Sequence, residues 1–281
     1  MIDLKNVEYK VLDVKIHALQ TNQAIDVIQH WLKNERSFHY ISSTNINNVA
    51  EAQDSAEYYE VMRNANLSVP DGIPLLWYGR YLGYDLPKRC GIEEIMMAAF
   101  ELSNNRTAPR TVAERGHSYS HYFYGNSPEV LKSLRKNLLK KYPNLNIAGM
   151  YSPPFRKLTP EEEDQHIAMI NSTHPDFLWV SLGCPKQELW LYRNRHKLNA
   201  VVGGGAGAVF NFLSGDTIKA PALIQYMGLE WLMRLSLNPK RLYKRYLIKY
   251  PKFVYKWMNN KTAPHASPVP AEKPVYAQSE Y

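Results

Sequence analysis

The chain has 281 residues, enough to bury a substantial core in one large domain or in one domain with an appendage. Hydrophobic residues make up 45% of it and charged residues 21%, which excludes a disordered, collagen-like or coiled-coil chain. The formal net charge of +8 gathers near the C-terminal end, and such a concentration predicts an anionic partner.

Cysteine and hydropathy patterns exclude further classes of protein. Cys90 and Cys184 lie far apart and outside a Cys-x-x-Cys spacing, so the sequence indicates neither a zinc site nor a disulfide framework. The N-terminal residues include an acid and no apolar run, so we expect no secretory signal. The longest apolar stretch, 201–213, contains four glycines and is shorter than the ~20 residues of a membrane-spanning helix. We therefore expect a protein of a reducing compartment that does not cross a bilayer.

Short β-rich runs alternate along the chain with amphipathic helical patterns, which predicts an α/β fold with a mostly parallel, Rossmann-like sheet flanked by helices. The predicted strands are 38–43, 65–69, 121–124, 146–150, 176–182 and 200–202. The predicted helices are 21–34, 46–63, 91–103, 127–141, 160–172 and 186–197. Between the third helix and the third strand, residues 103–120 show no period and predict a long polar loop.

The last part of the sequence has a different character. A helical pattern resumes at about 226, and residues 238–258 contain seven Lys or Arg, six aromatic residues and no acid. Residues 259–281 hold four prolines and mostly small or polar side chains, which cannot bury enough surface to order the segment. We predict an α/β core over 1–225, a basic amphipathic helical appendage over 226–258, and a disordered tail over 259–281.

Two polar clusters follow predicted strands, at the edge of the sheet where ligands of α/β proteins collect. The first is Ser43, Thr44 and Asn45, at a strand-to-helix turn where backbone donors suit phosphate or sugar hydroxyls; plain N-capping is the alternative. The second is Asp71 with Gly72, also at the end of a strand. An Asp-Gly pair is often only a turn, but at this edge we expect Asp71 to act as a general base.

A third cluster follows the apolar strand 176–182. Lys186, Gln187 and Glu188 open the next helix, and such amide and carboxylate side chains suit the recognition of uracil or a sugar. An acid in the first turn of a helix is also favourable for structural reasons alone.

The glycine-rich run that includes Gly204 and Gly205 formally fits a dinucleotide-binding pattern. The preceding strand lies too near the C-terminus for a first βαβ unit, so we give that interpretation little weight. Close approach of the backbone to a ligand phosphate or to a packed helix explains the glycines equally well. Since the sequence has neither an Asp-x-Asp motif nor a metal-ligand spacing, we expect no metal and no other cofactor.

Cationic and apolar side chains mix in residues 238–258. The apolar residues Leu242, Tyr246, Phe253 and Trp257 predict a face that enters the headgroup region of an anionic membrane. Nucleic acid is the rival partner, because its phosphates attract the same cations. A site for phosphates alone would not need the apolar face, so we expect a membrane surface and no nucleic acid.

In this order and spacing, the motifs resemble the WecG/TagA/CpsF family of glycosyltransferases, also called glycosyltransferase family 26. The family's Gly-x-Pro-Lys-Gln-Glu motif is met in full by residues 183–188, and its polar Thr/Ser-x-Asn turn by residues 43–45. Its strand-ending Asp-Gly looks like residues 71–72, and its Arg-x-x-Gly element is approximated by residues 89–91. The closing Gly-Leu-Glu-Trp-Leu-x-Arg-Leu and Pro-x-Arg patterns occur within 228–246, and the resemblance covers about 10–258.

The resemblance implies transfer of a hexose-type sugar from a UDP-sugar to a polyprenyl-diphosphate-linked saccharide in cell-surface polysaccharide biosynthesis. N-acetylmannosamine, its uronic acid and glucose all fit the family. Inversion, independence of metals and a peripheral location on the inner face of the cytoplasmic membrane are implied as well. So is an appendage that folds over the site, which makes Arg234, Arg241 and Arg245 candidates for holding a diphosphate.

The site implied by these motifs has Asp71 as the catalytic base. Lys219 stands where the family usually has Arg, so we expect a single contact to phosphate or carboxylate in place of a bidentate one. The other substrate-binding candidates are Ser43, Thr44, Asn45, Gly72, Arg89, Lys186, Gln187, Glu188, Gly204 and Gly205.

Two other functions stay open at this point. A nucleic-acid-binding α/β module would bind oligonucleotides with a steep salt dependence and would show no preference for liposomes. An NAD-dependent oxidoreductase, the less favoured alternative, would bind NAD rather than UDP.

Overall fold

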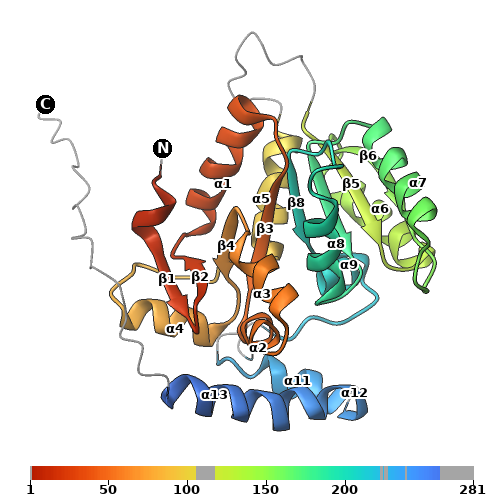
Figure 1. Ribbon diagram of the computed structural model, residues 1–281. Coiled ribbons are helices and arrows are strands. Elements are labelled where there is room, and N and C mark those ends of the chain that lie inside the picture. Colours follow the sequence, from red (N-terminus) through yellow and green to blue (C-terminus); the bar gives the residue numbers. More distant parts are fainter. Residues whose placement is uncertain (1, 106–117, 222–223, 225–226, 238, 260–281) are drawn as a thin grey trace, which may run out of the picture.

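A computed structural model describes residues 2–105, 118–221, 224, 227–237 and 239–259. Its centre is a six-stranded sheet in the order β4-β3-β8-β7-β5-β6, in which every neighbouring pair is parallel. Helices cover both faces of this sheet (Figure 1). The predicted fold class and five of the predicted strands are thus confirmed, whereas the predicted strand 200–202 overlaps the observed one only at Val202. The strands are β3 (His39–Thr44), β4 (Leu67–Pro70), β5 (Ser120–Gly125), β6 (Asn146–Tyr151), β7 (Phe177–Ser181) and β8 (Val202–Gly205).

The six predicted helices also occur, but 46–63 is two helices because Ser55 adopts an extended backbone and caps the second with its hydroxyl. Helices α4 and α9 were not predicted. Both begin directly after a strand and are short, so their periodicity is weak. The helices are α1 (Thr21–His30), η2 (Trp31–Glu35), α2 (Ile46–Asp54), α3 (Ala56–Arg63), α4 (Ile73–Tyr81), α5 (Ile92–Asn104), α6 (Pro128–Lys141), α7 (Pro160–Ser172), α8 (Lys186–Asn194) and α9 (Gly207–Ser214).

A β-hairpin near the N-terminus was missed as well. After the short 3-10 helix η1 (Leu4–Val7), β1 (Glu8–Val11) pairs with β2 (Val14–His17) in antiparallel fashion. The two turn residues, Leu12 and Asp13, both have positive φ angles of 46° and 66°. Hairpin turns of this kind usually contain Asn-Gly or Asp-Gly, and the sequence has neither pair here, so the hairpin could not be predicted from its turn.

The hydrophobic core forms two layers, one on each face of the sheet. In β7 the side chains alternate: Phe177 and Trp179 join the layer under α1, α5, α6 and α9, whereas Leu178 and Val180 join the layer under α2, α3, α4, α7 and α8. All four of these side chains are fully buried, as expected of a central strand in a parallel sheet covered on both sides.

The appendage forms the helices α11 (Glu230–Leu237), α12 (Pro239–Tyr243), η3 (Lys244–Lys249) and α13 (Tyr250–Asn259). Figure 1 shows it in blue, passing below α2 and α4, which begin at the carboxyl ends of β3 and β4. Phe253 is 4% exposed within the core layer on that side, and the ring of Trp257 lies 4.9 Å from that of Tyr78 on α4. Lys249 Nζ pairs with Glu51 Oε2 of α2 at 2.6 Å. The appendage is therefore docked on the core.

This docking corrects one prediction. Of the four side chains expected to face a bilayer, Leu242, Tyr246 and Phe253 are buried, and Trp257 packs on the core. An amphipathic pattern alone does not say whether the apolar face meets lipid or protein, and here it meets protein. The exposed apolar side chains of the appendage are instead Trp231, Leu232, Tyr243, Leu247, Ile248, Val254, Tyr255 and Met258.

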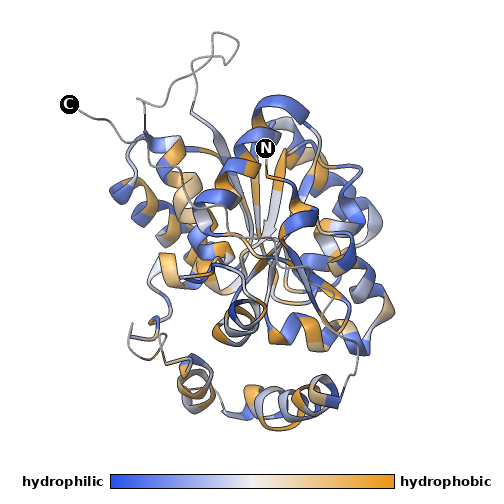
Figure 2. Ribbon diagram, turned by 90° about the vertical axis from the view of Figure 1, so that its left-hand side faces the viewer, coloured by the Kyte–Doolittle hydropathy of each residue, from blue (hydrophilic) through white to orange (hydrophobic). Residues whose placement is uncertain are grey.

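Other predictions fall outside the described residues. The predicted tail after Asn259 and most of the polar loop at 103–120 lie there, whereas Asn259 itself ends α13. The predicted domain boundary at 225 also lies outside the described residues, so the division into domains stays a prediction. Within the described ranges, no helix is both long and apolar enough to cross a membrane. The ribbon coloured by hydropathy shows polar and apolar residues interspersed along the appendage helices (Figure 2).

The glycines of β8 make space for packed side chains, which yields a prediction. A Cβ on Gly204 would lie 2.7 Å from Ile92 Cδ1 and 3.2 Å from Trp179 Cζ3. Because both neighbours are buried and would have to shift to make space, Gly204→Ala should destabilise the protein by about 1–3 kcal/mol in urea unfolding. Ser133→Ala, at an exposed position of α6, is the control and should cost less than about 0.5 kcal/mol. Equal stability of the two variants would contradict the packing role of Gly204.

Candidate active site

The first two polar clusters meet at the carboxyl ends of β3 and β4. Ser43 Oγ donates a hydrogen bond of 3.0 Å to Asp71 Oδ2 and accepts one of 3.0 Å from the Ile92 backbone N–H. The Asp71 N–H in turn donates to the Thr44 carbonyl at 2.7 Å. The two clusters at the strand ends therefore lie side by side. The Asp71 carboxylate follows β4 and accepts a hydrogen bond from Ser43 of β3. Gly72 follows with a φ of +101°, a conformation that favours glycine, and starts α4.

Thr44 and Asn45 have local structural roles. Thr44 is fully buried, and its hydroxyl bonds those of Ser42 and Ser68 at 3.1 and 2.6 Å, so it points into the protein rather than toward the ligand edge. Asn45 caps α2, since its Oδ1 accepts from the Asn47 N–H at 2.9 Å. For Asn45 the capping alternative is observed, and contact with a substrate stays a prediction for both residues.

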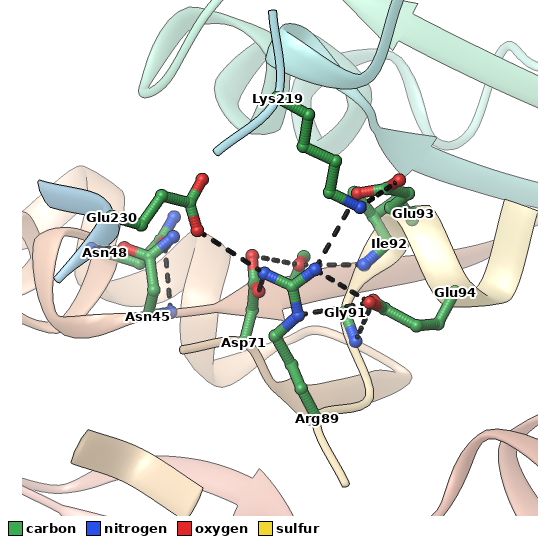
Figure 3. A network of polar contacts seen from close by, with 11 residues as sticks. Asn45, Asn48, Asp71, Arg89, Gly91, Ile92, Glu93, Glu94, Lys219 and Glu230 are labelled. Carbon is green, nitrogen blue, oxygen red and sulfur yellow. Dashed lines mark hydrogen bonds and ion pairs between the residues drawn. The ribbon is translucent and has the colours of Figure 1, made fainter. Parts of the chain in front are cut away.

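Arg89 lies at the centre of a cluster of carboxylates (Figure 3). Its Nε and Nη2 both bond Glu94 Oε1, at 3.1 and 2.7 Å. Asp71 and Glu93 carboxylate oxygens lie 3.7 Å from the guanidinium, and a Glu230 oxygen lies 3.9 Å from it. Arg89 was predicted to bind substrate, but the structure surrounds it with four acids of the protein itself.

Among the described side chains, the cluster carries more negative than positive charge. Lys219, the second described cation, bonds Glu93 Oε1 at 2.6 Å, so two described cations stand against the four carboxylates. An excess of carboxylates suits hydrogen bonds from sugar hydroxyl and amide groups better than it suits a diphosphate. Glu93, Glu94 and Glu230 were not predicted as site residues. The spacing of four residues from Arg89 to Glu93 was the available signal for the first. Glu230 is the acid of the Gly-Leu-Glu-Trp pattern, but only the tertiary structure shows that it lies beside Arg89.

The environment of Asp71 favours a base. Its side chain is 26% exposed, and burial raises the pKa of its carboxyl group. Arg89 lowers that pKa, Glu94 and Glu230 raise it, and the net direction is upward. A carboxylate whose pKa lies above the ordinary range accepts a proton more readily, which is what proton abstraction from a hydroxyl needs.

The third cluster faces the interior. Gln187 Oε1 accepts from the N–H groups of Gly183 and Gly207, each at 3.1 Å, and Gln187 Nε2 donates to Glu188 Oε1 at 2.8 Å. Gln187 therefore braces the loops that follow β7 and β8. Both Gln187 and Glu188 are buried, whereas Lys186 is exposed at the start of α8.

The two glycines predicted to approach a ligand instead approach protein. A Cβ on Gly205 would lie 2.6 Å from Gln187 Nε2, and Gly204 faces Ile92 and Trp179. The packed-neighbour explanation of the glycine-rich run is therefore the one that the structure supports. Contact of either glycine with a substrate phosphate stays a prediction.

The three arginines of the appendage stay predictions. The backbone of Arg234 lies in α11, that of Arg241 in α12 and that of Arg245 in η3, but their side chains are outside the described residues. Across the described ranges, no group of three or more His, Cys, Asp or Glu is arranged to hold a metal ion. Independence of metals stays a prediction too.

Comparison with known proteins identifies the chain. The model of the glycosyl transferase WecG/TagA/CpsF family matches residues 9–267. The chain belongs to this family. A relative from Bacillus subtilis, named N-acetylglucosaminyldiphosphoundecaprenol N-acetyl-beta-D-mannosaminyltransferase, is 27% identical over 87% of this chain and 90% of its own length. A protein of the same name from Bacillus spizizenii is 28% identical over 73% of this chain and 72% of its own.

This glycosyltransferase contains a buried acid whose protonation should govern its stability. Glu188 Oε2 finds no hydrogen-bond partner in the described part of the chain, and burial raises the pKa of the Glu188 carboxyl group from 4.5 to about 7. Below the ordinary value the acid is protonated in both the folded and unfolded states, so it carries no penalty. As pH rises toward 7 the unfolded chain loses this proton first, and folding becomes less favourable.

Glu188→Gln should therefore match the wild-type free energy of unfolding near pH 4 and exceed it by about 3 kcal/mol at pH 8. Urea titrations at the two pH values measure the difference. Glu161→Gln, at an exposed position of α7, is the control and should show no such pH dependence. A difference between Glu188→Gln and wild type that does not change with pH would mean that folding does not raise the pKa of Glu188.

Proposed function

We propose that this glycosyltransferase moves N-acetylmannosamine from its UDP derivative to N-acetylglucosaminyl-diphospho-polyprenol, with inversion at the transferred sugar. The names of both Bacillus relatives support this acceptor and this sugar. The observation that carries the proposal is the Asp71 carboxylate, which Ser43 holds at the sheet edge and whose pKa is raised by burial and, to a smaller extent, by Glu94 and Glu230.

Asp71 would act as the general base. It accepts the proton of the acceptor hydroxyl as that oxygen forms a bond to the anomeric carbon of the donor sugar, while the bond from that carbon to the UDP oxygen breaks. The hydrogen bond from Ser43 fixes the orientation of the carboxylate before the reaction. UDP then leaves as an anion, whose developing charge must be met by cations.

The cations that stabilise the leaving UDP would come from outside the acidic cluster around Arg89. Lys186 is exposed at the start of α8, and a groove of about 540 Å³ lies between α2 and the appendage. Lys244, Lys252 and Lys256 line this groove, together with Lys249, which already pairs with acids of α2. We propose that the sugars occupy the acidic cluster while the lysine-lined groove lies on the side of the diphosphate-linked lipid.

The appendage would also hold the enzyme at a membrane. Leu247, Tyr255 and Met258 are 58%, 73% and 81% exposed, and Lys252 and Lys256 are exposed beside them on α13. Apolar side chains next to cations fit the headgroup region of an anionic bilayer. Such contact would bring the enzyme to the inner face of the cytoplasmic membrane, where we expect the polyprenyl-linked acceptor.

Asp71→Asn tests the base. A general base contributes roughly 10²–10⁴-fold to the rate, so the variant should lose activity by that factor while it binds UDP with nearly unchanged affinity. Release of UDP is measured with UDP-N-acetylmannosamine and a short-chain N-acetylglucosaminyl-diphospho-lipid, with UDP-glucose and the uronic acid donor in parallel. Asp26→Asn, at an exposed position of α1, is the control and should keep full activity. If Asp71→Asn keeps most of the wild-type rate, Asp71 is only a turn residue.

Vesicle binding tests the membrane contact. Each lysine near an anionic surface is worth about 1 kcal/mol, so replacing Lys244, Lys252 and Lys256 together by Gln should weaken binding to anionic vesicles by about 100-fold or more in sedimentation. Replacing Lys132, Lys136 and Lys140 of α6 is the matched control, because these are exposed lysines on a core helix. Equal losses in both triple variants would indicate nonspecific attraction rather than a membrane face on the appendage.

A further inference from the structure

The appendage contributes a carboxylate to the surroundings of the proposed base. Glu230 is the first residue of α11, and its side chain is 21% exposed. Its Oε2 lies 3.9 Å from Arg89 Nη1, which in turn lies 3.7 Å from Asp71 Oδ1. Asp71 and Arg89 both belong to the core, so the docked appendage adds a charge that the core by itself lacks.

The guanidinium group of Arg89 has two sides with different partners. Its Nε and Nη2 are committed to Glu94 by hydrogen bonds. Its Nη1 lies 3.7 Å from Asp71 Oδ1 and 3.9 Å from Glu230 Oε2, and each distance is too long for a direct hydrogen bond. Two carboxylates thus attract the same nitrogen. If one of them were absent, Nη1 would be drawn toward the other.

We propose that Glu230 is a positioning residue that holds Arg89 between itself and Asp71, and that docking of the appendage thereby keeps the base free to take the acceptor proton. A direct hydrogen bond from Arg89 would occupy Asp71 Oδ1 and weaken it as a base. The inference rests on the proposed function, because it requires Asp71 to be the base. It adds a link from the appendage, which we place at the membrane, to the reacting group.

The sign of the electrostatic effect can be worked out. The charged groups around Asp71 are Arg89 in the loop before α5, Glu93 and Glu94 on α5, Lys219 after α9, and Glu230 on α11. Among them, Glu230 raises the pKa of Asp71 and Arg89 lowers it. Loss of the Glu230 charge should therefore lower that pKa, so Asp71 stays ionised to lower pH and is a weaker base.

The test uses the full chain with a short, water-soluble acceptor, and follows the rate against pH. Glu230→Gln should lower the rate on the pH plateau about three- to tenfold and move the acid limb down by roughly half a pH unit, the size expected of one partly exposed charge. Glu230→Asp keeps the charge and should hold the limb near its wild-type position. Glu101→Gln, an exposed acid of α5, is the control and should move neither quantity.

A second comparison tests whether Glu230 acts through Arg89. In an Arg89→Lys background the cation no longer reaches several carboxylates with separate nitrogens, so adding Glu230→Gln should change the plateau rate less than about twofold. An acid limb that stays in place in Glu230→Gln, or an equal loss in both backgrounds, would overturn the inference. If Asp71→Asn is inactive while Glu230→Gln behaves as wild type, the inference fails and the proposed base survives. If Asp71→Asn is active, both fail.

Discussion

The parallel pairing of β3 with β4 is the constraint on which the site depends. Thr44 is in register with Pro70, so the residues that follow each strand leave the sheet side by side. That register brings Ser43 Oγ within 3.0 Å of Asp71. It also lets the backbone N–H of Ile92, the first residue of α5, donate a hydrogen bond to the same Ser43 hydroxyl. A shift of one residue in β4 would turn its side chains to the opposite face and would separate these partners.

In our proposal, the core and the appendage use opposite charges to bind different parts of the substrates. The core gathers carboxylates around Asp71, which suits hydroxyl-bearing sugars and raises the pKa of the base. The appendage supplies lysines along a groove beside α2, which suits diphosphates and an anionic surface. Glu230 is an exception, because this acid belongs to α11 of the appendage and lies beside Arg89 of the core. In our proposal Glu230 couples the appendage to the core.

The Lys-Gln-Glu motif shows why a signature of an enzyme family need not mark its ligand contacts. Gln187 uses both ends of its amide to hold loops and a neighbouring acid, and it is 5% exposed. It holds the loops that follow β7 and β8 in place. Gly205 belongs to the same unit, since a Cβ there would collide with the Gln187 amide. Replacement of either residue is expected to move the loops that follow β7 and β8.

The sequence by itself determined the alternation of strands and helices, the parallel sheet and the adjacency of Ser43 and Asp71, because these follow from short-range periodicity and from the rule that parallel strands end at one edge. It did not determine the hairpin at 8–17, whose turn lacks the usual residues, or the direction in which the apolar face of α13 points. The sequence also did not show which charged residues surround Asp71. Arg89, Glu94 and Glu230 lie 18, 23 and 159 residues after Asp71, and contacts over such separations depend on how the elements pack. Only the tertiary structure brought these charges around one carboxylate.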